Sequence, residues 1–288
     1  MQITLIGTGL MGKPMAERLL GSGHDVVVYN RTPEKAKPLE ALGATIAPTA
    51  THAIQASPLT IFMVADAAAI RGIVFPPRGK PNLQGRTILQ MGTIAPEESV
   101  ALAQEVRVGI GDYLEAPVLG SIAEVRAGQL IVMVGGSAPQ WDRWVDLLKC
   151  FGPEPLLVGP VGHAAGLKLA LNQLIASHIA AFSLSLSLIQ RLGVDVEVFL
   201  KVLRPSPLAA PMFEKKLPRL LDRNYAQPNF PTAHLLKDVN LFLHAAEAAN
   251  LETSALKGIR SLLEKTLEKG LGEMDYSSLF ETVNPRNS

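Results

Sequence analysis

The sequence lacks several features that assign a chain to a class at once. Its single cysteine, Cys150, excludes an internal disulfide, and no CxxC or Cys/His cluster is present to form a structural zinc site. The charges nearly cancel, with 27 Lys and Arg against 26 Asp and Glu, so no basic excess points to nucleic acid or an anionic membrane as the main partner. We therefore predict a protein without a metal site, without a nucleic-acid partner and without membrane attachment.

Long uninterrupted apolar runs are also missing. The nearest approach is Ala164–Leu192, which contains Lys168, Asn172, Gln173 and several serines, and which we interpret as a long buried or interface helix. No basic and apolar presequence comes before the strand-like run that starts at Gln2, so we expect a cytoplasmic protein.

What the sequence does contain is a large apolar fraction, 48%, which is enough to build a sizeable core over 288 residues. Its first part alternates short β-branched runs with helical stretches, an alternation typical of a parallel α/β sheet. The predicted strands are 2–6, 26–29, 44–46, 59–64, 87–90, 112–115, 130–134 and 156–158, and the predicted helices are 14–22, 33–42, 96–106 and 139–151.

After Gly162 the strand signals stop. The remaining pattern predicts helices over 164–192, 195–203, 211–222, 234–249 and 255–269. We therefore predict an N-terminal Rossmann domain, a doubly wound sheet over residues 1–161. An all-α domain over 162–288 follows it, and a long helix joins the two.

The first predicted strand runs directly into Gly7-Thr8-Gly9-Leu10-Met11-Gly12, and a helix follows. This GxGxxG sequence is the dinucleotide-binding fingerprint, in which the glycines allow a tight turn, a close approach of the pyrophosphate and close strand–helix packing. The alternative is a glycine turn with a structural role only. We also expect Leu10 and Met11, and Met63 and Val64 at the end of the predicted strand 59–64, to contact the cofactor.

The end of the second strand indicates which dinucleotide binds. NAD sites usually place an acidic residue there to hold the ribose 2′-hydroxyl, but this chain has Asn30-Arg31-Thr32. Asn30 carries no charge to repel a 2′-phosphate, and Arg31 can form a bidentate pair with one. The sequence thus favours NADP(H), with a solvated surface arginine as the alternative.

Lys168 and Asn172 are one helical turn apart on an otherwise apolar helix face. A lysine on such a face is rarely buried without a partner or a chemical role. By spacing alone, a general acid–base lysine and a lysine whose charged end reaches solvent both remain open.

The opening segments 7–16 and 28–32 closely resemble those of the β-hydroxyacid dehydrogenase family, which includes 3-hydroxyisobutyrate dehydrogenases and glyoxylate/succinic semialdehyde reductases. Four further motifs resemble this family in the same order along the chain: Met91-Gly92-Thr93, 115–121, 162–172 and Lys237-Asp238. The likeness covers nearly the whole chain. It is strongest toward the glyoxylate/succinic semialdehyde reductases, because segments 115–118, 228–231 and 270–277 also resemble theirs.

The resemblance implies NADPH-dependent reduction of a small aldehyde acid, with Lys168 as the proton donor and Asn172 holding substrate or lysine in line. It places Thr93 beside the nicotinamide and Lys237 near the cofactor. Substrate contacts are implied for Leu119, Gly120, Ser121, Phe230 and Asp238. The related alternative is a dehydrogenase of the 3-hydroxyisobutyrate or tartronate semialdehyde type.

One departure from the family pattern affects the substrate. Leu119 stands where the family has a serine that helps to hold the substrate carboxylate, so a hydrogen-bond donor is replaced by apolar bulk. Arg126 is a possible compensating residue, and His163, next to the catalytic segment, is a possible lining residue. Cys150, Trp141 and Trp144 are interpreted as core residues.

Two other functional hypotheses stand beside the reductase, a non-catalytic binding module and an imine reductase. A non-catalytic NADP-binding module would have no need of Lys168 and Asn172, and imine reductases of similar architecture generally lack this lysine. The Ala-, Ser- and Leu-rich stretch 176–192 predicts a helix buried on most sides, so we expect a homodimer or homotetramer.

Overall fold

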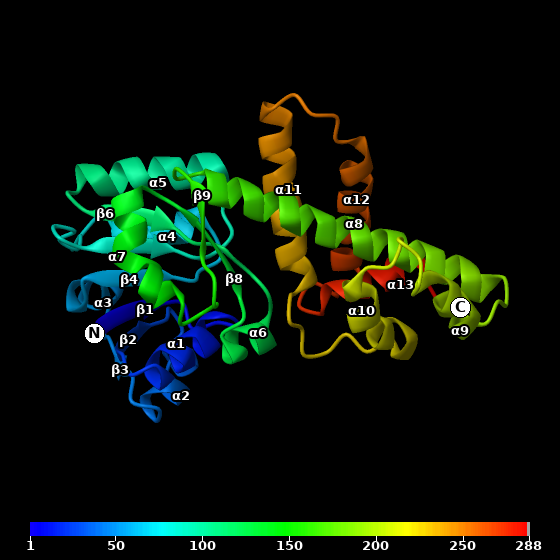
Figure 1. Ribbon diagram of the computed structural model, residues 1–288, viewed down its shortest axis with the longest axis horizontal. Helices are drawn as coiled ribbons and strands as arrows, with labels where there is room; N and C mark the ends of the chain where they lie inside the picture. The colour runs from blue at the N-terminus through cyan, green and yellow to red at the C-terminus, as the bar shows by residue number, and fades with distance from the viewer. Residues whose placement is uncertain (287–288) are drawn as a thin grey trace. The chain divides into compact units, whose positions relative to one another are not determined.

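The structure is a computed structural model that describes residues 1–286. It divides into two compact units, the first being Met1–Lys168 and the second starting at Leu169 (Figure 1). The predicted boundary, 161/162, and the observed one both lie near the start of one long helix, α8 (His163–Arg191).

The first unit is built on one mixed sheet in the order β3-β2-β1-β4-β5-β6-β8-β7, with β9 beside β8. Strands β3 to β6 are parallel, in the strand order of a Rossmann fold, as predicted. β8 then runs antiparallel to β6 and β7, which extends the parallel sheet at one edge. The strands are β1 (Gln2–Ile6), β2 (Asp25–Tyr29), β3 (Thr45–Ile46), β4 (Leu59–Phe62), β5 (Thr87–Gln90), β6 (Asp112–Glu115), β7 (Val118–Leu119), β8 (Ile131–Gly135) and β9 (Leu156–Gly159).

Helices cover both faces of this sheet, so its central strands are buried on both sides. One face packs against α1 (Gly12–Gly21), α2 (Lys37–Glu40) and α7 (Ala138–Leu148), and the other against α3 (Ala50–Ala56), α4 (Ala67–Val74) and α5 (Pro96–Val108). A short helix, α6 (Ile122–Ala127), follows β7. Because both faces are covered, every residue of β4 and β5 is buried, rather than every second one.

Most predicted elements of this unit are present, and β1, β5 and β6 have the predicted bounds. The predicted helix 33–42 is instead a 3-10 turn, η1 (Pro33–Lys35), followed by α2. Pro38 lies in the first turn of α2, where it starts a new helix because it cannot donate a backbone hydrogen bond to a preceding turn. The sequence reading missed β7, α3, α4 and α6.

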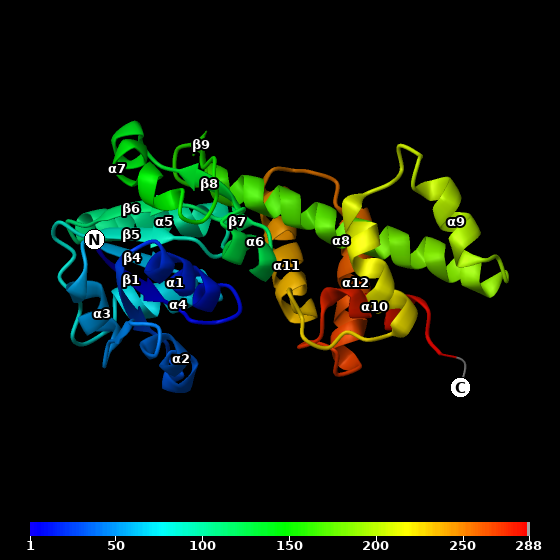
Figure 2. The same cartoon turned by 60° about the horizontal axis from the view of Figure 1, so that its bottom comes forward.

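The second unit is helical, as predicted, with α9 (Val196–Leu203), α10 (Pro211–Asp222), α11 (Thr232–Ala248), α12 (Ser254–Glu268), η2 (Tyr276–Leu279) and α13 (Phe280–Val283) (Figure 2). Its core includes Phe182, Leu186, Leu235 and Leu263. A buried ion pair joins Lys216 to Asp275, with Nζ 2.8 Å from each carboxylate oxygen. Burial lowers the pKa of Lys216, while the charge of Asp275 opposes that shift.

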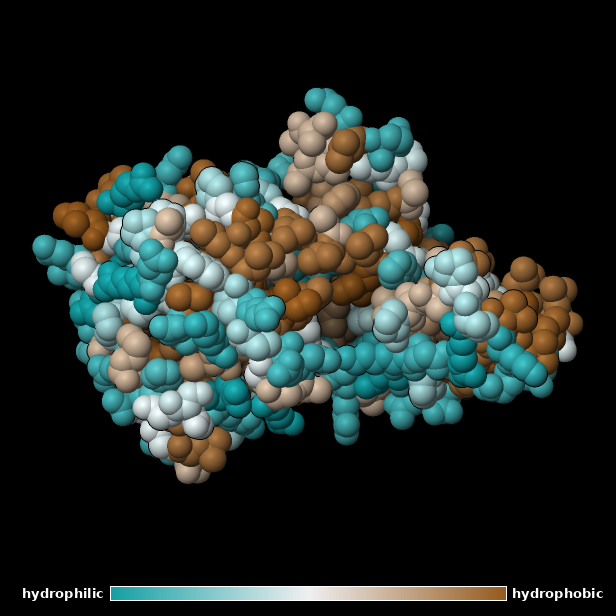
Figure 3. Space-filling model, in the orientation of Figure 1, coloured by the Kyte–Doolittle hydropathy of each residue, from teal (hydrophilic) through white to brown (hydrophobic). Residues whose placement is uncertain are grey.

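Helix α8 is long and apolar enough by length and composition to cross a membrane, a test that core helices of soluble proteins also pass. Its C-terminal half leaves Leu184 and Leu188 exposed, Leu192 is exposed just beyond its end, and α9 adds exposed Val198 and Val202. Figure 3 shows hydrophobic residues gathered over this part of the second unit. The predicted apolar character of 176–192 is therefore divided between a core side and a surface side.

Candidate active site

The predicted nucleotide residues gather at one edge of the sheet. The glycine loop follows β1, Asn30 follows β2, Met63 follows β4 and Thr93 lies just beyond β5. These four strands are parallel neighbours, so their carboxyl ends meet at the same edge. Strand order reverses between β1 and β4, which is where open α/β sheets bind their ligands.

The three glycines of the loop lie in different local surroundings, which explain separately why each position holds glycine. Gly7 has φ +98°, and a Cβ there would overlap the carbonyl of Met63; a Cβ at Gly12 would overlap the carbonyl of Gly7. Around Gly9, in contrast, a Cβ would meet nothing within 4 Å. Packing therefore requires glycine at two positions and leaves open space at the third, which is the position where a pyrophosphate comes closest to the backbone. The loop fits a dinucleotide.

Asn30 connects the glycine loop to the end of β2. Its Oδ1 accepts from the backbone N–H of Thr8 at 3.0 Å, and its Nδ2 donates to the carbonyl of Thr32 at 2.9 Å. This residue therefore shapes the loop, a role that the sequence reading did not foresee. Arg31 is exposed next to it, so its guanidinium is accessible to a phosphate.

The segment after β5 is held close to the nucleotide edge. A Cβ at Gly92 would lie 2.8 Å from the carbonyl of Val64, so glycine allows these two segments to meet. The side chain of Gln90 fixes the turn by donating to the carbonyl of Gly92 at 3.0 Å. Thr93, which follows, is half-buried.

Lys168 is the last residue of the first unit, in α8, and is only 9% exposed. Most of its side chain is therefore covered by the protein. His163, in the first turn of the same helix, is exposed and packs over Gly159, where a Cβ would lie 2.7 Å from its Nδ1.

The predicted substrate loop has an unexpected hydrogen-bond arrangement. Leu119 ends β7, Gly120 has φ +138°, and Ser121 is the N-cap of α6. Both the backbone N–H and the hydroxyl of Ser121 donate to Glu124, the N–H at 2.7 Å, as in a capping box. Both donors of Ser121 are therefore directed to a carboxylate of the chain itself.

Arg126 does not replace the missing serine at this loop in the described structure. Its guanidinium is 3.8 Å from the carboxylate of Glu17 on α1, and its side chain is 65% exposed.

In the second unit, Asn172 and Asp238 lie together. Nδ2 of Asn172 donates to Oδ2 of Asp238 at 2.6 Å, and both side chains are buried. Nζ of Lys237 is 3.0 Å from the other oxygen of Asp238. Within the described residues, Oδ1 of Asn172 is buried and has no hydrogen-bond partner, so it is an acceptor available to a ligand. Phe230 packs edge-on against Tyr276, with 5.8 Å between ring centres.

Glu115 has a position that the sequence did not reveal. It is completely buried, and its Oε1 accepts from the backbone N–H groups of Gly162, Ala164 and Ala165, at the start of α8. Burial raises the pKa of Glu115, and the hydrogen bonds from Ser99 and from these N–H groups oppose the shift.

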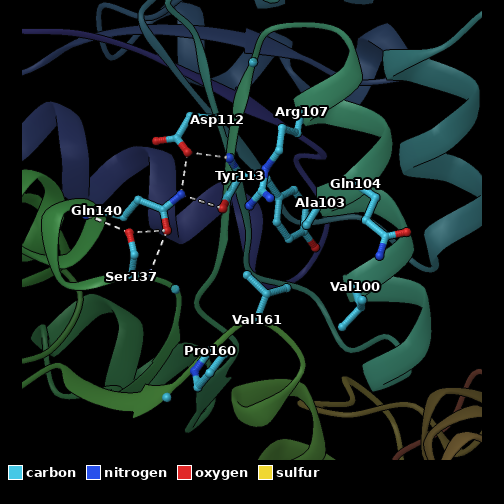
Figure 4. A pocket seen from close by; sticks show the side chains of 13 residues that line it. Val100, Ala103, Gln104, Arg107, Asp112, Tyr113, Ser137, Gln140, Pro160 and Val161 are labelled. Atoms are coloured by element: carbon cyan, nitrogen blue, oxygen red, sulfur yellow. Dashed lines mark hydrogen bonds between the residues drawn. The ribbon is translucent and has the colours of Figure 1, made fainter.

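A cavity of about 730 Å³ lies elsewhere on the first unit (Figure 4). Its walls come from α5, β6, the start of α7 and the end of β9, and they include Arg107, Tyr113 and Gln140. No predicted cofactor or substrate residue lines it.

Comparisons with known proteins agree with this geometry. Residues 2–159 match the family model of the NAD-binding domain of 6-phosphogluconate dehydrogenase, and residues 162–283 match that of the NAD-binding region of NADP-dependent 3-hydroxyisobutyrate dehydrogenase. The chain belongs to the 3-hydroxyisobutyrate dehydrogenase-like family. It is a nicotinamide-nucleotide-binding oxidoreductase, as predicted.

Two relatives within this family are informative. The chain is 32% identical to 2-hydroxy-3-oxopropionate reductase of Escherichia coli, over 98% of this chain and 97% of that protein. It is 30% identical to the chloroplastic glyoxylate/succinic semialdehyde reductase 2 of Arabidopsis thaliana, over 99% of this chain and 80% of that protein. A 3-hydroxyisobutyrate dehydrogenase structure from Salmonella typhimurium has the same fold, with a TM-score of 0.86 at 22% identity, covering 97% of this chain and 99% of that one.

Proposed function

We propose that this protein reduces a small aldehyde acid of the glyoxylate or succinic semialdehyde type to the hydroxy acid, with NADPH as the hydride source. The observation that carries the proposal is the buried Lys168, one helical turn before Asn172, in a chain that also holds a complete dinucleotide loop. The names of its relatives support an aldehyde acid as substrate.

The chain's own residues have distinct tasks in this mechanism. The N–H groups at Gly9–Gly12 and the start of α1 hold the diphosphate, and Arg31 binds the 2′-phosphate. The bound nicotinamide supplies the hydride. Lys168 donates a proton to the forming alkoxide and stabilises its charge, while Oδ1 of Asn172 accepts a hydrogen bond from the lysine or from the new hydroxyl.

A second candidate substrate class is favoured by the loop 119–121. Leu119 offers no side-chain donor, and both donors of Ser121 bind Glu124, so neither residue directs a free donor toward a substrate carboxylate. An uncharged carbonyl compound such as methylglyoxal has no carboxylate, so the absence of these side-chain donors would not weaken its binding.

One experiment separates these possibilities. NADPH oxidation is followed with glyoxylate, succinic semialdehyde, methylglyoxal and a cyclic imine at matched concentrations, and NADP reduction with 3-hydroxyisobutyrate. The proposal expects the highest kcat/KM for an aldehyde acid. Preference for methylglyoxal would support the uncharged class, and tight NADPH binding without any turnover would support a non-catalytic module.

We further propose a homo-oligomer, a dimer or tetramer, that covers the exposed leucines and valines of α8 and α9 with a second copy of the chain. Apolar side chains that are 55–69% exposed, such as Leu184, Val198 and Val202, are costly to leave in water. A monomeric mass by light scattering at micromolar concentration would contradict this.

A further inference from the structure

A buried chain of hydrogen bonds joins β6 and α5 to the first turn of α8. Tyr113 and Glu115 are two residues apart on β6, so their side chains lie on the same side of the strand, toward Ser99 of α5. The hydroxyls of Ser99 and Tyr113 are 2.8 Å apart, and the Ser99 hydroxyl also donates to Oε2 of Glu115. All three side chains are buried.

The other carboxyl oxygen of Glu115 binds α8. It accepts three backbone N–H bonds, from Gly162 at 2.8 Å, Ala164 at 2.9 Å and Ala165 at 3.1 Å. The first N–H groups of a helix have no partner within the helix, so a side chain 47 residues earlier in the sequence serves here as the cap. A carboxyl group at this end also interacts favourably with the helix dipole.

Two glycines make this arrangement possible. Gly135 of β8 pairs with Glu115, and a Cβ at residue 135 would overlap the carboxyl group. Gly162 has φ +99°, which lets the chain turn so that its N–H and those of Ala164 and Ala165 converge on one oxygen.

Lys168 follows directly in the same helix. It is four residues after Ala164 and three after Ala165, so it lies one turn above two of the N–H groups that Glu115 binds. Fixing the first turn of a helix sets how the helix is rotated about its axis and how far it is shifted along that axis. The position of a side chain on the next turn is thereby set as well.

We propose that Glu115 is a positioning residue for the reaction: through the cap on α8 it places the amine of Lys168 against the substrate carbonyl. The inference rests on the proposed role of Lys168. Misplacement of a reacting group by about 1 Å can cost about 100-fold in rate, so a defect in this cap should appear in kcat rather than in cofactor affinity.

The test compares two substitutions of similar size. Glu115→Gln keeps a carbonyl oxygen that accepts the three N–H bonds and an amide that donates to Ser99, whereas Glu115→Met fills the space without any acceptor. Ile54→Ala, at a fully buried core position in α3, serves as the control for loss of stability alone. Each variant is measured for kcat, KM, NADPH Kd and amide hydrogen exchange at the start of α8.

The proposal expects Glu115→Gln to keep kcat within about threefold and to retain exchange protection at Gly162, Ala164 and Ala165. Glu115→Met should lose that protection and about 10- to 100-fold in kcat, with NADPH Kd unchanged within about twofold. Ile54→Ala should keep kcat per folded molecule. If Glu115→Met does not fold, Ser99→Ala, which removes the donor to Oε2 together with the partner of the Tyr113 hydroxyl, should lower kcat severalfold.

Three results would overturn the proposal: wild-type kcat in Glu115→Met, equal losses in the Gln and Met variants, or an equal loss in Ile54→Ala. Failure of the proposed function would give a result distinct from these three. The wild-type protein would then turn over none of the carbonyl compounds, and hydrogen exchange would still show whether Glu115 holds the start of α8.

Discussion

The side-chain amide of Asn172 is fixed by Asp238, whose Oδ2 accepts a hydrogen bond from Nδ2 across 2.6 Å. This bond orients the amide, because its N–H group must face the carboxylate and its Oδ1 must face away from it. Lys237, with its Nζ 3.0 Å from Asp238, adds a positive charge to the same group. The pair thus presents a buried acceptor one turn beyond Lys168.

Changing this pair to two carboxylates should be costly. Asn172→Asp places like charges within hydrogen-bonding distance in a buried position, and we expect a loss of about 2–4 kcal/mol in the free energy of unfolding. The double variant Asn172→Asp/Asp238→Asn restores one amide and one carboxylate, and should recover most of that loss. Urea denaturation of the three proteins checks this, and a double variant as unstable as the single one would contradict it.

Lys168→Ala should nearly abolish turnover while NADPH still binds, because the diphosphate and 2′-phosphate residues are elsewhere in the sequence. General acid–base groups contribute about 10²–10⁴-fold, and the lost charge opposite the alkoxide adds to that. Lys168→Arg should not rescue activity, since a guanidinium is bulkier and holds its proton near neutral pH. The measurements are kcat and NADPH Kd. If the alanine variant keeps a large fraction of kcat, another group donates the proton.

Arg31→Ala should weaken NADPH binding by about 1.5–3 kcal/mol, the loss of a charge-assisted hydrogen bond, and leave NADH binding unchanged. The exposed position of Arg31 after β2 makes a general structural effect of the change small. Titration of both cofactors against wild type and variant gives the two affinities. Equal losses for NADPH and NADH would argue against a 2′-phosphate contact.

Leu119→Ser should increase kcat/KM for glyoxylate relative to methylglyoxal by about fivefold, which corresponds to one hydrogen bond of about 1 kcal/mol. Leu119→Ala is the matched control, because it removes the apolar bulk without adding a donor. If alanine gives the same gain as serine, space rather than hydrogen bonding limits the carboxylate substrates.

The raised pKa of Glu115 gives stability a defined pH dependence. Because burial holds the folded pKa above its ordinary value near 4.5, the folded state binds more protons than the unfolded state between these two pKa values. The contribution of Glu115 is therefore greatest below about pH 4.5 and falls as the pH rises through the folded pKa. Melting temperatures of wild type and Glu115→Gln are compared from pH 4 to pH 8, and the melting temperature of the wild type should fall relative to that of the variant as the pH increases. A rise of the wild-type melting temperature relative to the variant would contradict this prediction.

The sequence predicts the parts of this protein whose causes are local. The glycine loop, the strands around it and the long helix with Lys168 follow from hydrophobic patterns and from the spacing of a few residues. Ser121-x-x-Glu124 is also a local pattern, that of a capping box, and it explains why Ser121, which the resemblance places at the substrate, bonds Glu124 in the structure. The short helices α3 and α4 were missed because their patterns are brief and rich in alanine.

Other features could not be predicted because they depend on pairs far apart in the chain. Nothing near Glu115 indicates that its carboxyl group will meet Gly162, and nothing near Asn30 indicates that it will accept from Thr8. Such pairs are set by strand order and by the meeting of segments at one edge of the sheet, which only the folded chain supplies.

The non-local cap on α8 also has a consequence for how the protein becomes active during folding. A helix of 29 residues can form from local contacts within microseconds, but its cap exists only after β6 has joined β8 and lies beneath α5. Helical content should therefore recover early after dilution from denaturant, before reductase activity. In the interval the chain would be largely helical and compact, with its lysine still out of place.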